Sequence, residues 1–158
     1  MGKVTCFMGN KCAFTGHRNI KEDFSEEKLE KSVLYLIENR NVDTFLCGMA
    51  RGFDLIAGQL IIKLKGKYPY LKLIACVPCR GQESLFSSQT AKLYSDTLKG
   101  CDEVKVLSER YYNGCMQARD RYMVDNADVV LGYLNEGSGG TYYTVSYAEQ
   151  KGKELYII

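Results

Sequence analysis

Short apolar runs alternate with stretches of helical periodicity along most of the chain. The apolar runs lie at residues 11–15, 44–49, 71–77, 103–107, 129–134 and 154–158, and each predicts a strand. Within these runs, apolar and polar residues do not alternate as they do in strands with one solvated face. The pattern therefore favours strands that are covered on both faces, which is typical of a parallel sheet.

Helical patterns separate the predicted strands. The first begins at Ser25, a suitable N-cap residue, and its apolar stripe runs to about residue 40. Further helices are expected over 55–64, over about 85–99, from residue 116 to before residue 129, and after residue 141. This alternation predicts one domain over residues 1–158 with a Rossmann-like, doubly wound α/β fold. We expect a mostly parallel sheet of about six strands with helices on both faces.

Composition narrows the function classes. A net charge of +2 is too small to indicate nucleic acid or a membrane surface by itself, and no apolar stretch approaches the ~18 residues of a membrane span. The seven cysteines lack the spacing of a secreted disulfide framework, which favours the reducing cytoplasm. Cys76 and Cys79 form a Cys-x-x-Cys pair at a strand end, but with a single histidine in the chain a zinc site lacks ligands. We expect no metal and no cofactor.

A glycine-rich loop at residues 137–141 follows the strand predicted at 129–134 and opens a helix. Backbone N–H groups of such a loop can approach a phosphate, and the helix N-terminus adds partial positive charge. Thr141 falls where an N-cap hydroxyl is expected. The loop has neither the Walker lysine nor the Gly-x-Gly-x-x-Gly spacing, so an ordinary loop without a ligand stays the alternative.

Other unusual polar residues also follow predicted strands. Doubly wound sheets bind ligands outside the carboxyl ends of their strands, so these residues predict a ligand-binding rim. The expected binding residues are Thr15, Gly16, His17, Arg18, Arg51, Gly52, Asp54, Arg80, Gln82, Glu83, Arg119, Gly139, Gly140 and Thr141. Each has a simpler interpretation as a surface ion pair, a turn residue or a helix cap. Four loops that bring such groups to one rim favour a ligand site.

Five motifs then occur in order, at residues 15–18, 48–54, 81–83, 119–125 and 139–141. In this order and spacing the chain resembles the SLOG superfamily, the Rossmann-like group that includes the Smf/DprA and LOG proteins. Within it, the chain resembles the small, single-domain YpsA-like branch, over about residues 11–158. The resemblance implies a Rossmann-like sheet and a site for a nucleotide or a nucleotide-derived ligand.

The resemblance to LOG-type phosphoribohydrolases breaks at the catalytic position. Arg119, Gly140 and Thr141 match the part that implies phosphate binding, but Tyr143 or Thr144 stands where those enzymes carry a catalytic Glu. Cleavage of an N-glycoside needs a carboxylate, and the candidates Glu83 and Asp54 lie on other loops. The chain is therefore expected to bind without catalysis.

The leading hypothesis is a non-catalytic sensor or sequestering protein for an ADP-ribose-like or cyclic nucleotide signal. One alternative is an enzyme similar to the nucleoside-monophosphate phosphoribohydrolases. Another is DprA-like binding of single-stranded DNA, although the near-neutral charge argues against nucleic acid as a partner. A homo-oligomer, a dimer or a multiple of one, is also expected. LOG-like relatives associate through helices that flank the site, and Tyr142, Tyr143 and Tyr147 lie on such a helix. The alternative is that these rings simply cover the sheet.

Overall fold

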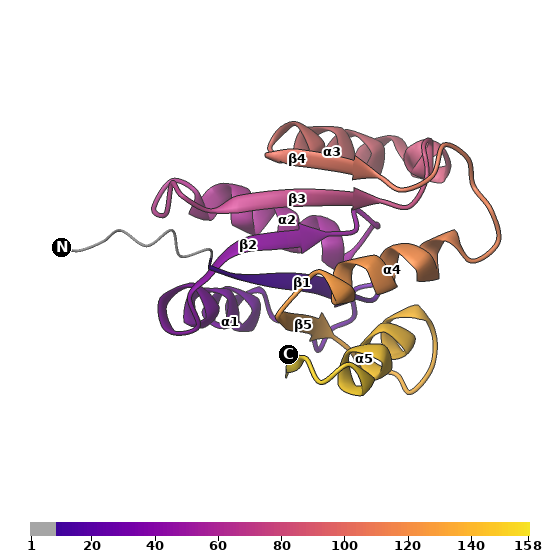
Figure 1. The fold of residues 1–158 in the computed structure, drawn as a ribbon. Coiled ribbons are helices and arrows are strands. Elements are labelled where there is room, and N and C mark those ends of the chain that lie inside the picture. Colours follow the sequence, from indigo (N-terminus) through magenta and orange to yellow (C-terminus); the bar gives the residue numbers. More distant parts are fainter. Residues whose placement is uncertain (1–8) are drawn as a thin grey trace.

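A computed structural model describes residues 9–158 and shows a six-stranded sheet with helices on both faces (Figure 1). The strands are β1 (Asn10–Gly16), β2 (Val42–Cys47), β3 (Lys72–Val77), β4 (Glu103–Val106), β5 (Val129–Tyr133) and β6 (Glu154–Ile157). Every neighbouring pair is parallel. The predicted α/β class is confirmed. Residues 1–8, part of the domain expected over 1–158, lie outside the described residues.

The helices follow the predicted order. They are α1 (Glu26–Asn39), α2 (Phe53–Leu64), α3 (Ser88–Lys99), α4 (Cys115–Asp125) and α5 (Gly140–Gln150), with a short 3-10 helix, η1 (Gln82–Leu85), before α3. Ser25 caps α1 as expected, because its hydroxyl accepts a hydrogen bond from the Lys28 N–H at 3.1 Å. None of the helices within residues 9–158 has the length and apolar character that a membrane crossing requires.

The strand order is β4-β3-β2-β1-β5-β6. The chain moves outward from β1 to β4 and then returns, so that β5 pairs with the free side of β1. The order thus reverses between β1 and β5. Loops that leave the carboxyl ends of these two strands diverge to opposite faces of the sheet, and this is where doubly wound folds bind ligands.

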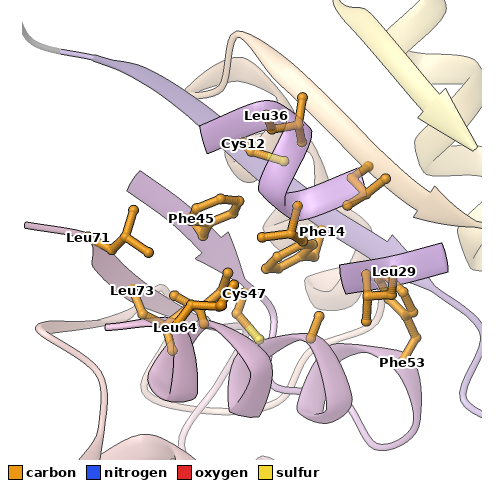
Figure 2. Packing of buried hydrophobic residues seen from close by; sticks show 14 of the residues in the cluster. Cys12, Phe14, Leu29, Leu36, Phe45, Cys47, Phe53, Leu64, Leu71 and Leu73 are labelled. Atoms are coloured by element: carbon orange, nitrogen blue, oxygen red, sulfur yellow. The ribbon is translucent and has the colours of Figure 1, made fainter. Parts of the chain in front are cut away.

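The two faces of the sheet bury different amounts of apolar surface. Under α1, α2 and α3 lies the larger cluster, in which the rings of Phe14 and Phe45 stack 5.4 Å apart and Phe53 meets Phe14 edge-on (Figure 2). The smaller cluster, under α4 and α5, contains Leu46 and Met123. Neighbouring residues of one strand point to opposite faces, so Phe45 and Leu46 belong to different clusters.

Three local expectations were wrong. The third helix begins at Ser88 rather than near residue 85, because Gly81 at φ +82° turns the chain into η1 and Ser87 then caps α3. The second strand ends at Cys47 rather than Met49, which adopts a left-handed backbone at φ 64°. Strand β4 is at the sheet edge and largely exposed, so it is not covered on both faces.

Candidate functional site

A cavity of about 430 Å³ opens at the point where the strand order reverses. Its walls come from the end of β1, the loops after β1, β2 and β5, and the first turns of α2, α4 and α5. The expected binding residues that line it are Thr15, Gly16, His17, Arg18, Asp54, Arg119, Gly140 and Thr141. The volume lies within the range of small-molecule sites.

The turn after β1 packs directly against the start of α2. The His17 carbonyl accepts a hydrogen bond from the Phe53 N–H at 3.2 Å. A Cβ on Gly16 would lie 2.3 Å from the Phe53 ring, and one on Gly52 would lie 2.2 Å from the Arg18 carbonyl oxygen. Gly52 also has φ +83°. Glycine is required at both positions, and the two loops form one continuous wall.

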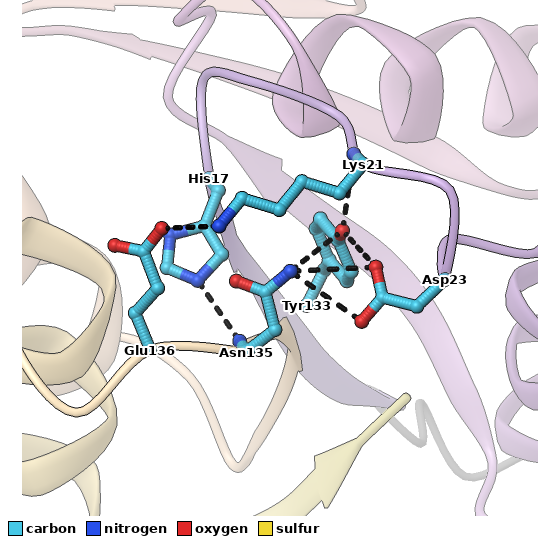
Figure 3. Close-up of polar contacts among 6 residues, drawn as sticks. All are labelled: His17, Lys21, Asp23, Tyr133, Asn135 and Glu136. Carbon is cyan, nitrogen blue, oxygen red and sulfur yellow. Dashed lines mark hydrogen bonds and ion pairs between the residues drawn. The ribbon is translucent and has the colours of Figure 1, made fainter.

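The His17 side chain contacts the loop that follows β5 and connects it to the loop after β1 (Figure 3). Its Nε2 accepts a hydrogen bond from the Asn135 N–H at 3.0 Å, and its ring meets Tyr133 edge-on at 5.5 Å. His17 acts as a structural acceptor between the two loops.

Further contacts reinforce the same connection (Figure 3). The Tyr133 hydroxyl donates to Asp23 at 2.7 Å, and this hydrogen bond lowers the pKa of the Asp23 carboxyl. Lys21 pairs with Glu136 at 2.8 Å. Glu136 lines the cavity, so this exposed ion pair stands at its mouth. The loops after β1 and β5 are thus held together across the switch point.

Arg119 is the central cation of the cavity floor. It is 4% exposed; Nε donates to Asp120 at 2.7 Å, and Nη1 donates to the carbonyls of Gly48 and Cys76. A Cβ on Gly48 would lie 2.6 Å from Nη1, so this approach requires glycine. Burial opposes the charge, but Asp120 and Asp54 outweigh burial and raise the pKa of Arg119. The guanidinium joins α4 to the ends of β2 and β3.

Asp54 lies on the first turn of α2 and is 6% exposed. Its Oδ2 accepts a hydrogen bond from the Ala50 N–H at 3.2 Å. Burial raises the pKa of Asp54 to about 7, although Arg119 pulls it down. Gly52 occupies the N-cap position, and no side chain among the described residues caps α2. Asp54 is therefore not the helix cap of the simpler interpretation.

The glycine loop brings the start of α5 to the cavity. Gly139, at φ +95°, is the N-cap, and Gly140 and Thr141 are the first residues of the helix. The expectation that Thr141 is the N-cap was wrong. The chain turns into α5 at Gly139, whose positive φ suits glycine, so the N-cap lies two residues before Thr141. Within residues 9–158 no side chain caps α5, so the first N–H groups stay available beside the cavity.

Asp120 and Thr144 connect α4 to α5 behind this loop. The Thr144 hydroxyl lies 3.1 Å from Asp120 Oδ2 and 2.9 Å from the Gly140 carbonyl, with one proton to donate between them. Asp120 also lines the cavity. A carboxylate thus stands next to Thr144, although residue 144 carries none.

A model of the YspA SLOG family matches residues 12–158. The chain belongs to this family. The UPF0398 protein of Halalkalibacterium halodurans is 28% identical over 98% of this chain and 84% of its own length. The SPbeta prophage-derived protein YoqJ of Bacillus subtilis is 27% identical over 79% of this chain and 80% of its own.

Two solved DNA processing protein A structures share the fold of this SLOG domain. The Helicobacter pylori protein superposes with a TM-score of 0.68 at 19% identity, and the Streptococcus pneumoniae protein with 0.65 at 20%. Each match covers 94% of this chain. The chain spans 65% of the first structure and 50% of the second.

Several residues expected at the SLOG site do not line the cavity: Arg51, Gly52, Arg80, Gln82, Glu83 and Gly139. Arg80 pairs with Glu109 at 2.8 Å on the surface, and Arg51 donates to Asn19 at 3.0 Å. Gln82 donates to the Gly48 carbonyl at 3.3 Å from behind the floor. The loop after β3 leaves the sheet two strands away from β1, which explains why it does not reach the cavity.

Five polar or flexible residues that line the SLOG cavity were not among the expected binding residues: Asn19, Met116, Gln117, Asp120 and Glu136. Met116 and Gln117 lie on the first turn of α4, one turn before Arg119. Helical spacing from Arg119 could have found Met116, because residues three apart share a face. Glu136 directly precedes the glycine loop and could have been found by proximity to it.

The three tyrosines of α5 do not all cover the sheet. Tyr142 and Tyr143 are exposed, whereas Tyr147 packs partly against the smaller core. The rings of Tyr143 and Tyr147 are 6.4 Å apart and nearly parallel, and the Tyr143 hydroxyl accepts a hydrogen bond from Arg121 at 2.9 Å. The expected homo-oligomer through this surface stays a prediction.

Proposed function

We propose that this SLOG domain binds a phosphate-bearing nucleotide derivative in the cavity between β1 and β5. The observation that carries the proposal is the N-terminus of α5, which faces the cavity at Gly140 and Thr141 without a side-chain cap from residues 9–158. Unpaired N–H groups and the helix dipole favour a phosphate there. An ADP-ribose-like or cyclic nucleotide signal that is sensed or sequestered fits this arrangement best.

The charged residues around the cavity also support phosphate binding there. Arg18 lies at the wall, and its side chain makes no hydrogen bond or ion pair with the residues that the structure describes. Arg119, by contrast, already bonds Gly48, Cys76 and Asp120. Arg18 is therefore the more available cation for a phosphate, and Arg119 maintains the floor beneath it.

A thermal-shift panel tests the proposal. It compares AMP, ADP-ribose and cyclic dinucleotides with adenosine and inorganic phosphate. We expect phosphorylated nucleotides to raise the unfolding midpoint far more than adenosine does. Arg18→Ala should weaken the affinity for these nucleotides at least tenfold, and so reduce the rise in the midpoint, because a charge-assisted hydrogen bond is lost. Arg80→Ala is the matched control, since Arg80 pairs with Glu109 outside the cavity.

A second pair of variants examines the loop. A Cβ at Gly140 or Gly137 meets nothing within 4 Å, and neither has a positive φ, so alanine fits both positions. Gly140 lines the cavity and Gly137 does not. Gly140→Ala should therefore weaken nucleotide binding while Gly137→Ala leaves it intact. Absence of a midpoint shift with every phosphorylated nucleotide would overturn the proposal.

One observation favours a phosphoribohydrolase as the second candidate. Asp54 and Asp120 both place carboxyls at the cavity, so a carboxylate for N-glycoside cleavage is present, although not on the glycine loop. Chromatography of the same AMP samples decides between binding and cleavage. Binding alone predicts intact AMP. Release of adenine by the protein and not by its Asp54→Asn variant would establish hydrolysis.

Single-stranded DNA is a third candidate because of the fold. The DNA processing protein A of Helicobacter pylori has a single-stranded DNA binding mode, and its fold matches this chain. This likeness weakens the expectation, drawn from the net charge, that nucleic acid is not a partner. An oligonucleotide of mixed sequence belongs in the panel, where salt-dependent binding that survives Arg18→Ala would favour DNA.

A further inference from the structure

Asp54 has one carboxyl oxygen that the protein itself does not use. Oδ2 accepts the Ala50 N–H, whereas Oδ1 accepts no hydrogen bond from residues 9–158. Among these residues, the fully buried side-chain polar atoms without a partner are Gln82 Oε1 and Asn135 Oδ1. Asp54 Oδ1 is therefore not sealed in the interior. Because Asp54 lines the cavity and is otherwise buried, this oxygen faces the cavity.

The fold uses this carboxyl for one hydrogen bond, from Ala50, and as a negative charge near Arg119, and neither contact gives Oδ1 a hydrogen bond. It does not cap α2, and Arg119, the cation that acts on it most strongly, forms its ion pair with Asp120 instead. A buried carboxyl with a single hydrogen bond is destabilising unless a further partner satisfies it. A partner from outside the protein would supply the missing hydrogen bond.

The charged groups around the cavity restrict what this partner can be. Arg18 comes from the loop after β1, Arg119 and Asp120 come from α4, and Glu136 comes from the loop after β5. Asp120 is paired with Arg119, whereas no cation of residues 9–158 pairs with Asp54, so a phosphate would be repelled next to Asp54 and the uncapped N-terminus of α5 is the better place for it. Above its raised pKa, where the Asp54 carboxyl is ionised and can only accept, the group that reaches it must donate hydrogen bonds.

We infer that Asp54 binds a ribose hydroxyl of the ligand and thereby selects ribonucleotide derivatives over their deoxy counterparts. The inference rests on the proposed function, because it places the phosphate at α5. Ribose fits the donor requirement since its adjacent hydroxyls are donors and the sugar lies next to the phosphate in any nucleotide. The amino group of a base is the competing donor and forms a separate arm of the test.

Titration calorimetry of the unaltered protein compares AMP with 2′-deoxy-AMP, 3′-deoxy-AMP and IMP. We expect at least one deoxy analogue to bind about tenfold to a hundredfold more weakly than AMP, the effect of one hydrogen bond to a charged acceptor. IMP, which keeps the ribose phosphate and lacks the amino group, should bind like AMP. Equal affinities for AMP and both deoxy analogues would overturn the inference, as would a selective loss with IMP.

Asp54→Ala completes the test. It should lower the affinity for AMP to that of the weaker deoxy analogue and leave that analogue unchanged. Glu83→Gln, which removes a carboxylate outside the cavity, should change neither value. Unfolding midpoints show whether each variant is folded, and the comparison of nucleotides on the unaltered protein holds even if Asp54→Ala is not. Binding of every nucleotide without discrimination refutes only the role of Asp54, whereas no binding of any phosphorylated nucleotide, ADP-ribose and cyclic dinucleotides included, refutes the proposed function as well.

Discussion

The face of the sheet under α1, α2 and α3 buries aromatic and aliphatic side chains almost exclusively, whereas the face under α4 and α5 buries a charged network beside a small apolar cluster. Phe14, Phe45 and Phe53 belong to the first face. Arg119 and Asp120 belong to the second, where they reach the cavity. The difference indicates that the first face holds the domain together and that the second also shapes the site.

Adjacent residues of β2 give the largest expected effect in this comparison. Phe45 is fully buried in the larger cluster, and Leu46 is buried in the smaller one. Phe45→Ala should lower the free energy of unfolding by about 4 kcal/mol, and Leu46→Ala by about 2–3 kcal/mol. Urea denaturation measures both. A larger loss for Leu46→Ala would mean that the face under α4 and α5 contributes more to stability than its apolar cluster indicates.

The order of strands and helices could be predicted from sequence because apolar runs and caps are local signals. Ser25 is one such cap. Strand pairing is not local, and nothing in the pattern says that β5 returns to β1. The sequence therefore predicted a rim of four loops, while the structure brings Arg18 and Gly140 to one cavity and leaves Arg80 outside it.

Asp120 shows why part of the site was not found. In the sequence it is one charge among several on a helix, and its importance comes from its neighbours in space. The Arg119 guanidinium and the Thr144 hydroxyl meet at its carboxylate, 24 residues before Thr144 in the chain. Arg119 was predicted, but as a phosphate ligand, whereas most of its hydrogen bonds serve the protein itself.

The next largest effect is the pH dependence of stability that comes from Asp54. This residue lies where α2 meets Arg119 and Asp120. Its pKa is raised from 3.8 to about 7 by burial, so the folded protein binds a proton that the unfolded chain has released. The free energy of unfolding should therefore fall as the pH rises from about 4 to about 7, by up to ~4 kcal/mol, and change no further from this group above that.

Asp54→Asn removes this titration while keeping the shape. The stability of the variant relative to the unaltered protein should rise between pH 4 and pH 8, as measured by urea denaturation at each pH. Asp96→Asn is the control, because Lys92 lowers the pKa of the exposed Asp96 below 3.8, so its titration ends below this range and the relative stability of the variant should stay nearly flat between pH 4 and pH 8. A stability difference for Asp54→Asn that is independent of pH would show that the buried carboxyl has an ordinary pKa.

The last prediction compares the two partners of the Asp120 carboxylate, Arg119 and Thr144, by their contributions to the free energy of unfolding. Asp120→Ala leaves the buried Arg119 guanidinium without its ion pair and should cost about 3 kcal/mol of unfolding free energy. Thr144→Val removes one neutral donor with little change of shape and should cost about 1 kcal/mol. Because both variants act on one carboxylate, the double variant should cost less than the sum. If Asp120→Ala costs no more than Thr144→Val, then Asp54 has replaced Asp120 as the counter-ion, and nucleotide binding should weaken because Oδ1 of Asp54 is no longer free.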